Sequence, residues 1–438
     1  MVVFLFWIIQ LAALVAGQGL DQCYANVSDP YLMFATGTAY ELIYDKRTSP
    51  VSIEQCEPQQ FWLISRHGTR YPPSDGIASL QTLSNLRDNI IQNHEIAKRG
   101  RLCEEDLENL KEWTLQVLTT LTSDLTVQGY NDLHKMAQRY KERFPTLLNH
   151  SYSKDLFEFR FANSQRTTAS GFAFVDGLFG TSTRVNLPEP LDDDQLIKPY
   201  DTCQKWKREV DENPDTVKEM YDFQDGDIMA SLLQNVSLRL GFNTTITIDN
   251  VNAMYDGCRF DKAWHVQEIS PWCAMFSEEE LKVMEYREDL LYYYYAGYGM
   301  DLNKQVGCPP VKDFLDRFSQ IENGSPQPAG VFYFTHSEML QMILLPLGIA
   351  QDEEPLTHSN YEQMRNRLWK TSYITPFAIN LAVVLFRCDA QEQYKVQFYL
   401  GENLLYFEGC DQGLCDWSYI KKEFGSISTT CNLDFCSM

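Results

Sequence analysis

The 438-residue chain has little positive charge and no long apolar stretch beyond its first residues. It carries 37 Lys and Arg residues against 60 Asp and Glu, which gives a formal net charge of −23 at pH 7. This charge argues against nucleic acid and anionic membrane surfaces as partners, because both attract basic proteins. After residue 17 no apolar run is long enough to cross a bilayer, so we expect no stable membrane insertion. Internal repeats and low-complexity segments are also missing from the sequence.

Residues 1–17 are apolar and uncharged, and small residues close the run. They predict a secretory signal peptide, although the basic residue that usually precedes the apolar core is missing. Secretion agrees with the 12 cysteines, an even number that suits disulfide bonding. Asn-x-Ser/Thr sequons provide candidate glycosylation sites at Asn26, Asn149, Asn235, Asn243 and Asn323. We therefore expect a secreted glycoprotein, with the lumen of the endoplasmic reticulum as the alternative location.

The segment 66–70, Arg-His-Gly-Thr-Arg, carries the most informative chemistry. It follows the short apolar run 61–64, which predicts a buried strand. Two arginines beside His67 favour its uncharged imidazole and make a place where a phosphate can sit. An uncharged imidazole beside a bound phosphoryl group is a nucleophile in position, and Gly68 leaves room for the phosphate. The alternative is a solvated basic loop in which the histidine has no role.

Two further strand patterns end in polar residues. The alternating run 157–161 predicts a strand, and Arg166 follows it near the start of a helix. The apolar run 331–335 predicts another buried strand, which leads into His336 and Glu338. Because the carboxyl ends of parallel strands meet at one edge of a sheet, three parallel neighbours would bring all these side chains into one pocket.

This set of side chains suits phosphoryl transfer without a metal ion. His67 would attack phosphorus, and a protonated Glu338 would give its proton to the leaving oxygen. The arginines and His336 would stabilise the charge on the phosphate oxygens. As alternatives, His336 and Glu338 form a surface pair or a metal site, and Arg166 is a helix cap. The nearby arginines disfavour a cation, so we expect neither a metal nor a cofactor.

The residue pattern changes between positions 191 and 315. Helical patterns dominate this region and strand-like runs are few, which predicts a mainly α-helical insertion at 191–315. The parts on either side, 18–190 and 316–438, would form an α/β domain. The run from Tyr292 to Tyr295 lies in the insertion, and we interpret it as packing against a neighbouring element.

Two helices are predicted in the α/β part, one before and one after the strand at 157–161. Apolar residues at steps of three and four predict a helix over 126–144, which ends before Pro145. Small apolar residues predict a second helix over 169–179, with Asn163 or Ser164 as its cap.

These motifs resemble the histidine acid phosphatases and, among them, the multiple inositol polyphosphate phosphatases. The central stretch is Arg66-His67-Gly68-Thr69-Arg70-Tyr71-Pro72, with His336-Ser337-Glu338 on a distant strand. The similarity extends to residues 34–44, Cys56-Glu57-Pro58, Ser270-Pro271-Trp272-Cys273, Ala296-Gly297-Tyr298-Gly299 with Cys308, and Glu354-Pro355-Leu356-Thr357 with Tyr361. Members usually read His-Ala-Glu where this chain has His-Ser-Glu, a change that leaves the two reactive side chains in place.

The resemblance implies the histidine phosphatase fold, an α/β sandwich domain with an inserted mainly α-helical domain. It implies a phosphohistidine on His67, proton donation by Glu338 and a supporting role for His336. The phosphate-binding residues implied by it are Arg66, Arg70, Arg166 and Thr69. It also implies the disulfides Cys56–Cys388, Cys258–Cys273 and Cys410–Cys415, and a bond from Cys203 to the C-terminal tail.

Residues and resemblance together predict a secreted, metal-independent phosphomonoesterase acting on inositol polyphosphates, phytate included. We expect a monomer whose partner is a small polyphosphorylated molecule. With a net charge of −23, the chain must then concentrate positive charge locally in its cleft. The alternatives are a general acid phosphatase, an inactive anion-binding protein on the same scaffold, and a mutase of the same superfamily.

Overall fold

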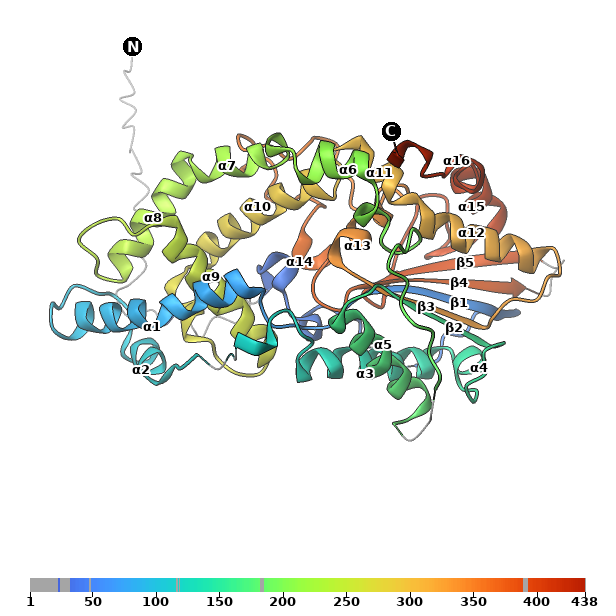
Figure 1. The fold of residues 1–438 in the computed structure, drawn as a ribbon, viewed down its shortest axis with the longest axis horizontal. Coiled ribbons are helices and arrows are strands. Elements are labelled where there is room, and N and C mark those ends of the chain that lie inside the picture. The colour runs from blue at the N-terminus through green and yellow to red at the C-terminus, as the bar shows by residue number, and fades with distance from the viewer. Residues whose placement is uncertain are drawn as a thin grey trace, which may run out of the picture.

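The computed structural model describes Cys23 and residues 32–46, 49–115, 117, 119–181, 185–388 and 393–437. The predicted signal peptide, residues 1–17, and the sequon at Asn26 lie outside these residues. Within them, one mixed sheet forms the centre of the α/β part, on the right of Figure 1.

Seven strands make up this sheet in the described part of the chain. They are β1 (Cys56–Arg66), β2 (Phe157–Phe161), β3 (Gly330–Thr335), β4 (Asn380–Cys388), β5 (Gln393–Leu400), β6 (Asn403–Leu404) and β7 (Leu414–Asp416). Their order is β2-β3-β1-β4-β5-β6, and β7 also pairs with β5. β2, β3 and β1 are parallel neighbours, and β4 to β7 pair antiparallel. The condition under which the three site-bearing strands would bring their side chains into one pocket, parallel pairing, is therefore met.

Helices cover the sheet and also form a separate helical part. In chain order they are α1 (Ser74–Glu95), α2 (Glu104–Glu112), α3 (Val127–Arg143), α4 (Pro145–Leu148), α5 (Gln165–Phe179), α6 (Gln204–Trp206), α7 (Lys218–Gln224), α8 (Asp227–Arg239), α9 (Ile248–Trp264), α10 (Glu278–Tyr295), α11 (Asp301–Val306), α12 (Cys308–Glu322), α13 (Ser337–Leu344), α14 (Thr371–Ile374), α15 (Trp417–Phe424) and α16 (Ile427–Thr430). A π-helical turn, Lys207–Asp211, continues α6.

Both faces of the sheet are covered by helices (Figure 1). Successive side chains of β1 point to opposite faces, so Phe61 and Leu63 pack towards α3 and α5 while Trp62 packs towards α12. The ring centroids of Phe61 and Tyr140 of α3 lie 4.8 Å apart, and those of Trp62 and Phe314 of α12 lie 5.5 Å apart. Burial on both sides explains why β1 has a continuous apolar run instead of an alternating one.

The helical part, around α7 to α10 on the left of Figure 1, draws on more of the chain than residues 191–315. α1 packs against α9, where a Cβ added to Gly257 would lie 2.8 Å from Leu83 Cδ1. In the other direction, α12 begins at Cys308, inside the predicted insertion, yet it covers the sheet. Each of these helices packs where its apolar face is buried, and this does not depend on its position in the sequence.

Local capping decides where two predicted helices begin. The helix predicted over 126–144 is α3, and Thr126 caps it by accepting the Gly129 N–H at 3.0 Å. The helix predicted over 169–179 begins earlier, at Gln165, after Ser164 as its N-cap. The first turn of α5 consists of polar residues, so the pattern of apolar residues predicted a later start for the helix.

All twelve cysteines lie in the described residues and form six disulfides. The bonds are Cys23–Cys103, Cys56–Cys388, Cys203–Cys436, Cys258–Cys273, Cys308–Cys431 and Cys410–Cys415. They include the three pairs implied by the resemblance, and Cys203 reaches the C-terminal tail. Such bonds suit an oxidising compartment. Among the described helices, none combines the length and apolar character that crossing a membrane requires.

A buried carboxylate links three distant segments of the α/β part. Glu402, fully buried between β5 and β6, accepts two hydrogen bonds from Arg139 of α3, at 2.6 and 2.8 Å. It also accepts one from the Tyr40 hydroxyl at 2.6 Å. Because both charges are removed from water, each depends on the other to be tolerated in the core.

Replacing Glu402 by Ala should therefore lower the free energy of unfolding by about 3–5 kcal/mol, since it leaves the Arg139 guanidinium buried and unpaired. Denaturant unfolding of the purified variant measures this loss. The matched control is Glu362→Ala, which breaks the exposed ion pair with Arg365 and should leave stability within error. A loss of less than about 1 kcal/mol for Glu402→Ala would contradict the assigned role.

Candidate active site

The backbone of His67 is held between two neighbouring chain segments at the end of β1. Its N–H donates to the carbonyl of Thr335, the last residue of β3, at 3.0 Å. Its own carbonyl accepts the N–H of Ala378, just before β4, also at 3.0 Å. The side chain is 2% exposed. The position of the imidazole is therefore set by the sheet itself.

Hydrogen bonding selects one tautomer of His67. The Nδ1 atom lies 2.9 Å from the carbonyl oxygen of Gly68. A carbonyl only accepts, so Nδ1 carries the proton and Nε2 keeps its lone pair. Burial, followed by the positive charge of Arg66, holds the pKa of His67 well below 6.5. The ring is thus an uncharged base with a free Nε2.

The loop after His67 is packed against the first turns of α3. A Cβ on Gly68 would lie 2.3 Å from the carbonyl oxygen of Gly129. The Thr69 hydroxyl donates to Asp132 Oδ2 at 2.8 Å, and the Thr69 carbonyl accepts the Thr126 hydroxyl at 2.9 Å. Gly68 is therefore required for the close approach of α3, and the Thr69 hydroxyl binds Asp132 instead of lining the cavity around His67.

Side chains from three strand ends place buried nitrogen atoms, without partners in the described part of the chain, in the cavity beside His67. Arg66 donates through Nη1 to the carbonyls of Thr36 and Thr375, at 2.6 and 2.8 Å, which fixes its guanidinium. Three buried nitrogens nevertheless have no partner among the described residues: Arg66 Nε, Arg166 Nε and His336 Nδ1. Buried polar atoms are normally hydrogen-bonded, so this cluster is suited to an anion that accepts from all sides.

Crowding of positive charge is visible in the pKa values of the same residues. Burial and then the charge of Arg70 lower the pKa of Arg66 to about 9. Burial and then the charge of Arg166 lower the pKa of Arg70 to about 10. The pKa of His336 is held well below 6.5 by burial, then by Arg166 and Lys198. A bound phosphate would relieve this repulsion.

These side chains line a cavity of about 270 Å³. Its walls are Arg66, His67, Arg70, Arg166, Lys198, Tyr200, Asp201, Trp206, Lys207, Asp211, Tyr295, His336, Ser337 and Glu338. Three arginines and two lysines face three carboxylates there, whereas the whole chain carries −23. The local concentration of positive charge that an anionic substrate requires is present.

Glu338 enters the cavity from the first turn of α13, whose N-cap is His336. Its carboxylate accepts the Ser337 hydroxyl at 3.2 Å. The rings of His67 and His336 have their centroids 5.6 Å apart. Of the residues proposed from the sequence, the structure gathers Arg66, His67, Arg70, Arg166, His336 and Glu338 around one cavity, and it leaves Thr69 outside.

The run from Tyr292 to Tyr295 contributes one residue to the cavity that was not proposed from the sequence. Tyr293 and Tyr294 pack as interpreted, with Tyr293 edge-on to Trp369. Tyr295, in contrast, lines the cavity and donates its hydroxyl to Asp211 at 2.7 Å. Its ring also packs edge-on against Trp206, with the centroids 5.3 Å apart, so the packing interpretation holds for Tyr293, Tyr294 and Tyr295.

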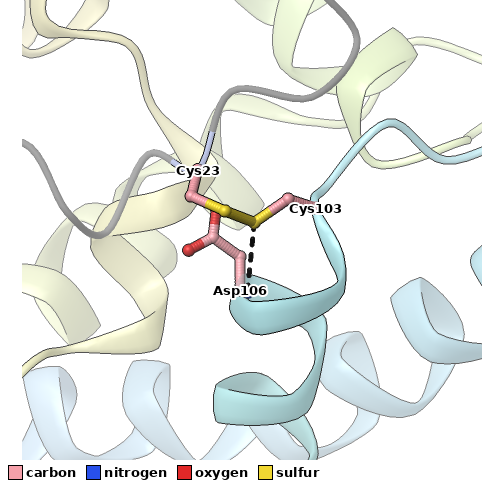
Figure 2. A group of neighbouring side chains, drawn as sticks. All are labelled: Cys23, Cys103 and Asp106. Atoms are coloured by element: carbon pink, nitrogen blue, oxygen red, sulfur yellow. Dashed lines mark hydrogen bonds between the residues drawn. A yellow bond between two sulfur atoms is a disulfide. The ribbon is translucent and has the colours of Figure 1, made fainter.

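Two groups of side chains in the described residues have metal-ligand spacing, and neither includes a cavity residue. The first is Cys23, Cys103 and Asp106, where Figure 2 shows the two sulfurs joined in a disulfide and so not available as thiolates. The second is Glu219, Asp222 and His358, on the surface, where the Glu219 carboxylate already accepts from the His358 ring and backbone nitrogens.

Comparison with known proteins defines the class. The family model for the histidine phosphatase superfamily (branch 2) matches residues 59–400, so the chain belongs to that family and is a phosphoric monoester hydrolase. It is 34% identical to multiple inositol polyphosphate phosphatase 1 of Drosophila melanogaster, over 98% of this chain and 93% of that protein. The Homo sapiens protein of the same name is 27% identical, over 93% and 88% of the two chains.

Solved structures confirm the predicted histidine phosphatase fold. The phytase from D. castellii superimposes with a TM-score of 0.73 at 18% identity, covering 93% of this chain and 88% of that one. The multiple inositol polyphosphate phosphatase of Bifidobacterium longum, in complex with phosphate, gives a TM-score of 0.67 at 13% identity, covering 92% and 99%.

The lowered pKa of His67 predicts the acidic side of the pH–rate profile. The imidazole is charged only well below pH 6.5, so kcat/KM should not fall with an enzyme pKa near 6.5 as the pH is lowered from about 7 to about 5.5. The profile should be measured with two aryl phosphates whose phosphate groups have different pKa values. If the apparent pKa on the acidic side of the profile changes with the substrate, it reports ionisation of the substrate and not of the enzyme. A limb near 6.5 common to both substrates would contradict the uncharged state assigned to His67.

Proposed function

We propose that this protein is a secreted phosphatase that hydrolyses the phosphomonoesters of inositol polyphosphates, phytate included, through a phosphohistidine on His67. The observation that carries the proposal is the uncharged His67, with Nε2 free, beside the unpaired Nε atoms of Arg66 and Arg166. The names of the relatives, multiple inositol polyphosphate phosphatase 1 and phytase, support this class of substrate.

The first half-reaction transfers the phosphoryl group to the enzyme. One substrate phosphate binds among the arginines and His336, which stabilise the charge on its non-bridging oxygens. His67 Nε2 attacks phosphorus, forming a P–N bond while the bond to the ester oxygen breaks. Glu338 gives its proton to that oxygen, which leaves as the hydroxyl of the product. The Gly68 carbonyl, which accepts from Nδ1, stabilises the positive ring of the phosphohistidine.

The second half-reaction releases phosphate. Water attacks phosphorus from the side that the product has left, and the Glu338 carboxylate takes a proton from it. The P–N bond breaks, and His67 returns to the uncharged form with the proton on Nδ1. Because Glu338 must start the cycle protonated, we expect an acidic optimum.

Secretion and glycosylation are parts of the same proposal. Four of the sequon asparagines, Asn149, Asn235, Asn243 and Asn323, are exposed and so accessible to a glycosyltransferase. The six disulfides agree with passage through an oxidising compartment.

Incubation of the purified protein with phytate tests the function. We expect release of phosphate with successive lower inositol phosphates as products, and the order of the isomers identifies the preferred positions. His67→Ala should lower turnover by at least about a thousandfold, because the nucleophile is lost, with an unchanged circular dichroism spectrum.

Excess EDTA should leave this activity in place, since no step of the proposed reaction uses a metal ion. Hydrolysis of aryl phosphates but not phytate would instead favour a general acid phosphatase. Comparable turnover by a folded His67→Ala protein would contradict the mechanism.

A further inference from the structure

The cavity is lined partly by a lysine, Lys207, whose role the phosphoryl-transfer reaction does not explain. It follows Trp206 of α6, and the first turn of α13 contributes Ser337 and Glu338 to the same cavity. After Trp206, the last residue of α6, the chain forms the π-helical turn Lys207–Asp211, and both end residues of that turn line the cavity. π-Helical turns are rare and occur frequently at functional sites.

Lys207 differs in its contacts from Lys198 and Arg70, two other cations of the cavity. Lys198 forms an ion pair with Asp201, and Arg70 donates to the Tyr71 carbonyl at 2.8 Å. Lys207 is half-buried and its backbone is hydrogen-bonded to Cys203 and Glu212, but its ammonium group has no hydrogen-bond or ion-pair partner among the described residues. Its ammonium group is therefore available to a ligand in the cavity.

The turn that carries Lys207 is rigidly held. The preceding Trp206 is 2% exposed and donates through its indole nitrogen to Asn303 at 2.8 Å. Cys203, just before α6, is bonded to Cys436 of the tail. On the other side, the Thr216 hydroxyl donates to the Val210 carbonyl at 2.8 Å. A backbone fixed at both ends lowers the entropic cost of placing the ammonium group against a ligand.

We propose that Lys207 binds a substrate phosphate other than the one being hydrolysed, and so favours polyphosphorylated over singly phosphorylated substrates. This inference rests on the function proposed above and names one of its specificity residues. The phosphate that reacts lies against the strand-end arginines and His67, whereas Lys207 belongs to the helical wall of the same cavity. A substrate with several phosphates would place one of them against each of these two groups of side chains.

Lys207→Met tests the proposal, because methionine keeps the apolar stem and removes the charge. The kcat/KM for phytate should fall at least about tenfold more than the kcat/KM for phenyl phosphate, because one charge-assisted contact with the substrate is removed. The change should be a higher KM for phytate, with kcat little affected. Lys207→Arg should recover most of the lost activity. The control is Lys205→Met, on α6 just before the turn and outside the cavity, which should behave as the wild type.

A second measurement does not depend on phytate turnover. With phenyl phosphate as substrate, the inhibition constant of inositol hexasulfate should rise at least about tenfold in Lys207→Met, and that of inorganic phosphate should rise much less. Equal losses for both substrates and both inhibitors would overturn the role of Lys207 while leaving the proposed function standing. Failure of the wild type to hydrolyse phytate at all would overturn the proposed function, and this inference with it.

Discussion

The burial of several arginines around one uncharged histidine is the constraint on which the rest of the site depends. His67 is fixed by hydrogen bonds to residues beside β3 and β4, and its ring is too poorly solvated to hold a charge next to Arg66. Burial and the same crowding lower the pKa of Arg66, whose Nε has no hydrogen-bond partner among the described residues. In the proposed mechanism one bound phosphate would satisfy these groups, so that affinity for the phosphoryl group and the nucleophilic state of His67 would have a common origin.

The fold provides this arrangement because three parallel strands end at the same edge of the sheet. β1 delivers His67 and β3 delivers His336 with Glu338, while β2 leads into the turn of α5 that bears Arg166. The helical part then closes the other side of the cavity. Its lysines extend the positive charge beyond the reacting phosphate, in a protein whose overall charge would repel an anion.

The site residues that directly follow a strand in the sequence could be predicted from it. The strand-to-helix transitions predicted that His67, Arg166 and Glu338 lie close together, because the carboxyl ends of parallel strands meet at one edge of the sheet. Residues that depend on packing between distant segments were not predictable. Lys207 begins a π-helical turn and lines the cavity together with residues from distant segments, and the Thr69 hydroxyl donates to Asp132 on α3, which no local pattern links to it. Likewise α1 joins the helical part because its apolar face fits α9.

The most direct test of the central claim is to identify the phosphorylated residue. The Glu338→Gln variant should be mixed with a ³²P-labelled aryl phosphate of good leaving ability, which needs no proton donor, and quenched in alkali, where phosphohistidine survives. Because the proposed mechanism makes Glu338 the base in the second half-reaction, the phosphoenzyme should accumulate, with the label on the peptide that contains His67. Label on a different residue, or steady release of phosphate with no labelled protein, would contradict the central claim.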